Sequence, residues 1–143
     1  MSFVLWENAS KANINSPIHM RDLEQEVKTY MEERAWHRLR PGDVAKSISI
    51  EAAELLEVFQ WDNPELDEVR ADTERVEKIK KELADVLIYC LNMSVILDLD
   101  TQEIIRAKLE KARQKYPAEL FKDSDPSKAG TDDTYWKIKR EHR

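Results

Sequence analysis

Two helical, largely apolar segments of this chain each carry a pair of carboxylates three residues apart. The first pair is Glu51 and Glu54, and the second pair is Glu82 and Asp85. Residues i and i+3 share a face of an α-helix, so each helix would present its two carboxylates side by side. Two such helices packed together would therefore bring four carboxylates to one place.

Both pairs lie on the helix faces that are expected to pack. At about 100° per residue, Glu51 falls within roughly 40° of Val44 and Leu55, and Tyr89 lies near the second pair. Burying several unpaired like charges is very costly, and a bound cation is the usual remedy. An all-oxygen ligand set suits a hard ion such as Mg²⁺ or Mn²⁺. The alternative is ordinary surface charge, because 36% of the residues are charged.

These segments resemble the MazG-like, all-α nucleoside triphosphate pyrophosphohydrolases, in particular the small single-domain members related to dCTP pyrophosphatase. The resemblance rests on the runs Ser47–Trp61, Glu82–Tyr89 and Lys108–Pro117, and it covers roughly Asp22 to Leu120. It implies Mg²⁺-dependent hydrolysis of a (d)NTP to the (d)NMP and pyrophosphate, in a house-cleaning role for the nucleotide pool. It also implies a homodimer or homotetramer. The catalytic and metal-ligand roles would fall to Glu51, Glu54, Glu82 and Asp85.

The composition bounds the remaining possibilities. A length of 143 residues suits one domain with its own core. The net charge of −6 argues against a nucleic-acid polymer as the main ligand. The best apolar run, 86–97, is too short to span a bilayer, and no secretory signal is visible, so we expect a cytoplasmic protein with no membrane partner. The single cysteine, Cys90, lies in an apolar helix, and we interpret it as a structural thiol.

The pattern predicts an all-α, four-helix-bundle-like fold. Only two glycines occur, and the sequence lacks the alternation of Val, Ile and Thr that would indicate a strand. Short links between helices suit an antiparallel bundle. We expect a single domain 1–143, made of an N-terminal arm 1–17 that contains Trp6, a helical core 20–117, and a C-terminal loop and short helix 118–143. Within the core, helices are expected at about 20–38, 43–59 (with Asp43 as the N-cap), 72–97 and 102–115, and the polar segment 65–73 is expected to be a loop or a short turn.

Several side chains near the carboxylates are candidate substrate contacts. Tyr89 follows Asp85 by four residues and can reach the same site, although a core tyrosine is the alternative. Trp61 follows the first carboxylate helix, where an exposed aromatic could stack on a base. The resemblance suggests that Lys108 contacts phosphate, whereas a solvated helix face is the default.

Trp36 and His37 could form the other wall of a base site. Relatives often carry Trp-x-x-Phe-His-x-Pro in this region. Here the aromatic lies one place later, and Leu39 stands in the position of the histidine, before Pro41. This departure leaves the base preference open.

Two other classes of protein fit parts of the pattern. One is a helical-bundle interaction protein whose acidic site is vestigial. The other is a di-iron carboxylate bundle, which normally needs Glu-x-x-His. None of the three histidines, His19, His37 and His142, has a glutamate three residues before it.

The phosphate bond that is cut can also be predicted. Gly42 and Gly130 stand alone, so the chain cannot build the glycine-rich loop with a lysine that many γ-phosphate hydrolases use. If the base lies near Trp61, the phosphate nearest the base meets the metal first. We therefore expect attack at the α–β linkage, and the family resemblance supports the same bond.

Overall fold

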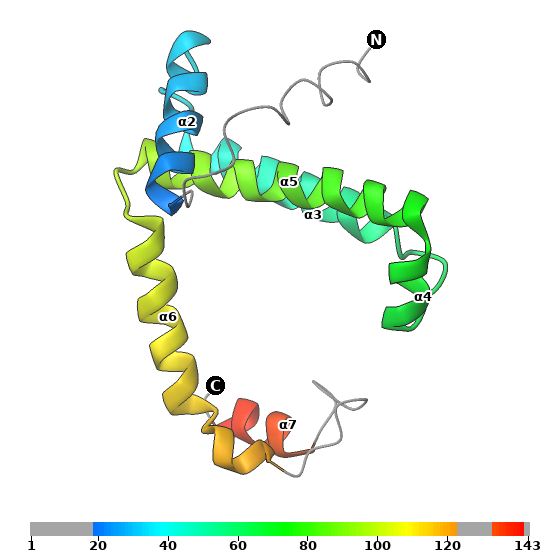
Figure 1. Cartoon of the computed structure of the whole chain (residues 1–143). Helices are drawn as coiled ribbons and strands as arrows, with labels where there is room; N and C mark the ends of the chain where they lie inside the picture. The colour runs from blue at the N-terminus through cyan, green and yellow to red at the C-terminus, as the bar shows by residue number, and fades with distance from the viewer. Residues whose placement is uncertain (1–18, 123–132, 142–143) are drawn as a thin grey trace. The chain divides into compact units, whose positions relative to one another are not determined.

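The computed structural model describes residues 19–122 and 133–141, and every regular element among them is helical (Figure 1). This confirms the all-α prediction. The expected arm 1–17, with Trp6, lies outside the described residues. No described helix is long and apolar enough to cross a membrane. The elements are α2 (Met20–Glu33), α3 (Pro41–Glu57), α4 (Leu66–Ala71), α5 (Thr73–Ile96), α6 (Thr101–Lys115), the 3₁₀ turn η1 (Ala118–Phe121) and α7 (Asp133–Glu141).

The chain divides into two compact units, with the boundary between Leu99 and Asp100. In the first unit α3 and α5 lie side by side along their length, and α2 crosses α5 near the end where α5 finishes (Figure 1). Met31 of α2 and Val44 of α3 are its fully buried apolar residues. The carboxylate pairs are thus carried by two helices in direct contact.

The helix ends follow local chemistry. α3 begins at Pro41 after Arg40, so the expected N-cap Asp43 instead lies in the first turn. A proline is favoured at the first helical position because it has no N–H to leave unpaired. The expected loop 65–73 contains the six-residue helix α4, in which the backbone N–H of Glu65 donates to Glu68 Oε2 at 3.0 Å. This reciprocal cap explains how so short and polar a segment becomes helical.

α2 ends at Glu33, several residues before the expected end at 38, because the chain turns at Ala35. Ala35 has φ 56°, in the left-handed region. The Trp36 N–H donates to the Met31 carbonyl at 2.8 Å, and the Ala35 N–H donates to the Glu32 carbonyl at 3.1 Å. This is a Schellman motif with alanine where glycine is usual. The turn brings Trp36 back edge-on against Tyr30, with ring centroids 5.8 Å apart.

An ion pair joins the end of α3 to the start of α5. Arg75 donates to both carboxylate oxygens of Asp62, at 3.1 and 2.8 Å, and its side chain is 23% exposed. Asp72, the N-cap of α5, accepts from the Arg75 backbone N–H at 3.0 Å. The pairing fixes the link between the two carboxylate helices across α4.

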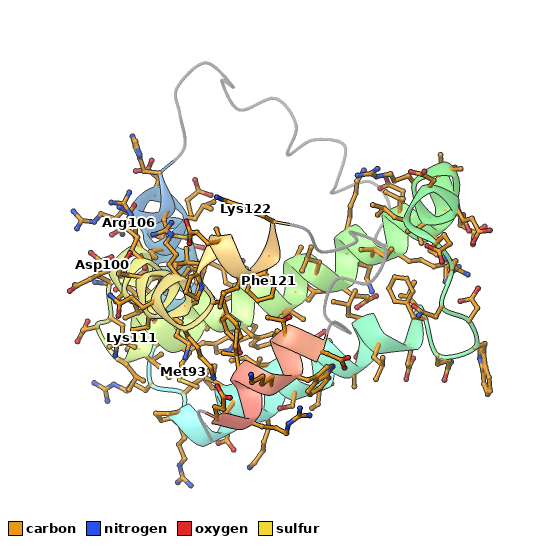
Figure 2. The ribbon with its side chains drawn as sticks, turned by 90° about the horizontal axis from the view of Figure 1, so that it is seen from below. Met93, Asp100, Arg106, Lys111, Phe121 and Lys122 are labelled. Carbon is orange, nitrogen blue, oxygen red and sulfur yellow. The ribbon has the colours of Figure 1, made fainter. Side chains whose placement is uncertain are left out.

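The second unit holds α6, η1 and α7. Figure 2 labels Asp100, the N-cap of α6, and Phe121, the last residue of η1. The expected short tail helix is present as α7, with Ile138 buried. Tyr116 stacks on Tyr135 at 5.5 Å between ring centroids, which ties α7 to the end of α6.

Candidate metal and nucleotide site

Three carboxylates converge between α3 and α5. Glu51 of α3 and Glu82 and Asp85 of α5 each offer an oxygen within 4.8 Å of the other two. All three residues are half-buried. The helical spacing inferred from the sequence therefore does place these groups on facing sides of packed helices.

The cluster holds more negative charge than its protein partners neutralise. The Glu82 side chain is 12% exposed, and its Oε1 accepts from Lys81 Nζ at 2.9 Å. Its other oxygen, Oε2, is buried and has no hydrogen-bond partner among the described residues. A buried carboxylate oxygen without a donor is costly, so a cation that approaches it would relieve that cost.

The pKa of the Glu51 carboxyl is raised above its ordinary value of 4.5, first by burial. Repulsion from Glu54, Asp85 and Glu82 raises this pKa further, and Lys81 partly opposes them. A like-charge cluster raises carboxyl pKa values because each ionised group disfavours the next. The donor set is all oxygen and strongly anionic, which fits a hard divalent cation.

Glu54, the remaining carboxylate of the predicted set, lies beside this cluster and outside the group of three. It is exposed on α3 and lines a pocket together with Glu82. The negative charge of Glu54 repels that of Glu51 and raises the pKa of the Glu51 carboxyl. Glu54 is therefore a solvent-accessible carboxylate at the edge of the candidate metal site.

Two pockets open on either side of the cluster. The polar pocket, of about 480 Å³, is lined by Glu54, Glu57, Val58, Gln60, Asp72, Glu74, Arg75, Lys78 and Glu82. The aromatic pocket, of about 670 Å³, is lined by Glu26, Val27, Tyr30, Trp36, Leu39, Ser47, Asp85, Ile88, Tyr89 and Asn92. Both volumes fall in the range of small-molecule sites.

One face of α5 runs through both pockets. Its residues recur every three or four positions, which is the spacing of a single helical stripe. The stripe begins with two cationic side chains in the polar pocket and continues with two carboxylates. It ends with a phenol and an amide in the aromatic pocket. In order these residues are Arg75, Lys78, Glu82, Asp85, Tyr89 and Asn92.

Two of the five predicted substrate contacts line a pocket beside the carboxylate cluster, and three do not. Trp36 and Tyr89 line the aromatic pocket next to Asp85. Trp61 is 90% exposed and is not among the lining residues of these two pockets. His37 is exposed in the turn after α2, and Lys108 is exposed on α6 in the second unit.

Sequence reasoning missed three polar groups of the aromatic pocket, Glu26, Tyr30 and Asn92. Asn92 carried a usable signal, because it follows Asp85 by seven residues and so returns to the same helix face. Tyr30 carried none, because only the crossing of α2 over α5 brings it to the site.

Comparison with known proteins identifies relatives of this chain. Two of them, dCTP pyrophosphatase 1 of Mus musculus and dCTP pyrophosphatase 1 of Homo sapiens, are each 28% identical to this chain over 108 residues, or 73% of its length. The chain spans 63% of the length of these curated relatives. The crystal structure of a pyrophosphatase from Archaeoglobus fulgidus DSM 4304 is 36% identical, with a TM-score of 0.60 over 73% of this chain and 99% of that one.

Residues 46–132, which include both carboxylate pairs, match the MazG-like family. This match covers more than half of the 143 residues. The all-helical structure and the facing Glu51, Glu82 and Asp85 agree with it. The chain is therefore a member of the MazG-like family.

Proposed function

We propose that this protein is a Mg²⁺-dependent nucleoside triphosphate pyrophosphohydrolase, with Mn²⁺ as an alternative ion. It converts a (d)NTP to the (d)NMP and pyrophosphate and so cleans or balances the nucleotide pool. The observation that carries the proposal is the cluster of Glu51, Glu82 and Asp85, with a buried Glu82 oxygen that has no donor among the described residues. The relatives named as pyrophosphatases support the same activity.

Each carboxylate has a role in this proposal. Glu51, Glu82 and Asp85, with Glu54 at the edge, would hold the metal. When bound, the ion would supply charge for the triphosphate and a lowered pKa for a water. Glu54 is exposed beside the cluster, and we assign to it the removal of the proton from the attacking water. The Tyr89 hydroxyl, one turn from Asp85, would donate to a phosphate oxygen.

The two pockets favour one orientation of the substrate. The aromatic pocket, with Trp36 and Tyr89, suits a base and sugar. The α-phosphate would then lie at Asp85, and the β- and γ-phosphates would extend toward the polar pocket. Attack at the α-phosphate would expel pyrophosphate there, which is the cleavage expected from the sequence. The base lies at the opposite end of the cluster from the position expected beside Trp61.

The polar pocket explains why a cation would be needed. Its lining contains five acidic residues and two basic ones. The two basic residues are already engaged, because Arg75 pairs with Asp62 and Lys78 pairs with Glu74 at 2.7 Å. A triphosphate would be repelled from this surface unless divalent cations accompanied it. Trp61, His37 and Lys108 stay proposed substrate contacts, to be tested one by one.

We further propose a homodimer or homotetramer. Leu83 and Leu87, one turn apart on α5, are 43% and 54% exposed, and Leu56 on α3 is 66% exposed. Helices of a stable monomer would normally cover such a face, and a second copy could cover it here. Light scattering at micromolar concentration should give a mass of at least twice 16.8 kDa. A monomeric mass would overturn this part of the proposal.

The activity is tested by incubating the protein with a panel of dNTPs in Mg²⁺ or EDTA and resolving the products by ion-exchange chromatography. We expect NMP with pyrophosphate in Mg²⁺ and no turnover in EDTA or in Glu51→Gln. NDP with orthophosphate would overturn the mechanism. Absence of turnover on every nucleotide would favour the interaction protein with a vestigial acidic site.

A further inference from the structure

Asn92 is a buried polar residue of α5. It is 5% exposed on α5, and its Oδ1 has no hydrogen-bond partner among the described residues. A buried acceptor without a donor lowers stability, and an apolar residue at the same position would avoid that cost. An amide that remains in such a place is a candidate for recognition of a ligand that supplies the missing donor.

The amide lies in the aromatic pocket, beyond the carboxylates. Asn92 shares its lining with Trp36, Tyr30 and Tyr89, and all of them surround the same space. It follows Asp85 by seven residues, which is about 10 Å along the helix axis. That separation suits a nucleoside whose phosphate lies at Asp85 and whose base edge reaches Asn92.

Two polar residues of the pocket lining, Glu26 and Asn92, would gain a hydrogen bond from a donor on the ligand. Glu26 of α2 lines the pocket, and an ionised carboxylate can only accept hydrogen bonds. Asn92 Oδ1 is an acceptor without a donor. A base that carries an exocyclic amino group would supply a donor to Asn92 Oδ1, whereas a carbonyl oxygen at the same place would not.

We propose that Asn92 is the base-reading residue of this site and accepts a hydrogen bond from the exocyclic amino group of the base. This rests on the proposed nucleotide activity and adds a determinant of base selectivity to it. Selectivity arises because a carbonyl-bearing base would leave the buried acceptor unpaired and would set an oxygen against it.

The test compares dCTP with dUTP, because the two differ in the base only at the amino-bearing carbon and the adjoining ring nitrogen. In Asn92→Leu the ratio of kcat/KM for dCTP over dUTP should fall by roughly tenfold to a hundredfold, the range for one buried hydrogen bond. The loss should appear mainly in the KM for dCTP, because the contact is made equally in ground and transition states. Asn92→Asp, which keeps an acceptor, should retain the preference for dCTP.

Thermal unfolding separates recognition from a structural role. Asn92→Leu removes the unpaired acceptor, so its Tm should equal or exceed that of the wild type. A purely structural asparagine would give the opposite pattern, a lower Tm with an unchanged ratio. Ser94→Ala is the matched control, because Ser94 is 4% exposed on the same helix and does not line the pocket. Its ratio should stay that of the wild type.

The outcomes distinguish this inference from the proposed function. If the wild type turns over no nucleotide and binds neither α,β-imido dCTP nor α,β-imido dUTP by calorimetry, both are overturned. If the wild type is active and the ratio in Asn92→Leu is unchanged, Asn92 loses its role and the activity stands. If Asn92→Leu fails to fold, Asn92→Asp decides, and an equal kcat/KM for dCTP and dUTP in that variant overturns the inference.

Discussion

Replacement of Glu51 by glutamine should stabilise the metal-free protein and destabilise the metal-loaded one relative to the wild type. The carboxylates of Glu51, Glu82 and Asp85 lie within 4.8 Å of one another. Two unit charges at that distance repel by about 1 kcal/mol in water and about 3.5 kcal/mol at an effective dielectric constant of 20. Because the cluster is half-exposed, we expect the lower value to govern. In EDTA, Glu51→Gln should gain about 1 kcal/mol, or roughly 3 °C in Tm for a chain of this size.

Mg²⁺ should reverse the order of the two proteins. An ion at a hundred times its Kd stabilises the folded state by about 2.7 kcal/mol, and the variant, lacking one ligand, should lose most of that gain. Glu32→Gln is the matched control, because Glu32 is exposed on α2 outside the cluster. Its Tm should change little in either buffer, and its response to Mg²⁺ should be that of the wild type. Equal stabilisation of wild type and Glu51→Gln by Mg²⁺ would refute the metal site.

The same reasoning fixes the pH dependence. The folded-state pKa of Glu51 is raised above 4.5, so the folded protein binds more protons than the unfolded chain just above that pH. Metal-free stability should therefore fall as pH rises from 4.5 through the raised pKa. Glu51→Gln should lose this contribution, and its advantage in EDTA should vanish at lower pH. An advantage in EDTA that persists below pH 4.5 would show that the gain does not come from charge repulsion.

Three further predictions concern the base site, the turn at Ala35 and the ion pair between Asp62 and Arg75. Trp36→Ala should raise the KM for the nucleotide by about tenfold with little change in kcat, because base stacking contributes binding common to ground and transition states. Trp61→Ala tests the base site expected from the sequence. A larger increase in KM in Trp61→Ala than in Trp36→Ala would place the base at the other end of the cluster. Ala35→Gly should raise the free energy of unfolding by about 0.5–1 kcal/mol by urea titration, because residue 35 has φ 56° and only glycine adopts that conformation without strain; a loss of stability would contradict the Schellman turn. Arg75→Gln and Asp62→Asn should each lower the free energy of unfolding only slightly, since the pair is partly exposed. In a double-mutant cycle the combined loss should be smaller than the sum of the two single losses. Strict additivity would mean that the ion pair contributes nothing.

The helical fold and the carboxylate cluster could be predicted from the sequence because both depend on local periodicity. Glycine scarcity and absent strand patterns predict helices, and three-residue spacing fixes which side chains share a face. Glu51, Glu82 and Asp85 follow from that rule as soon as two such helices pack together. The short helix α4 was missed because its stability comes from a reciprocal cap between Glu65 and Glu68, a signal weaker than periodicity.

The position of the aromatic pocket required the tertiary structure. Trp36 reaches it because Ala35 adopts a left-handed conformation, and Tyr30 reaches it because α2 crosses α5. Neither the turn nor the crossing is encoded in a periodic pattern: the turn places alanine where glycine is the usual signal, and the crossing depends on contacts between segments far apart in the chain. Trp61 is 90% exposed, as expected of an aromatic side chain available to stack on a base, and its contact with substrate stays a prediction. The sequence by itself determined the helices and the acidic chemistry of one face, and helix packing decided which pockets that face borders.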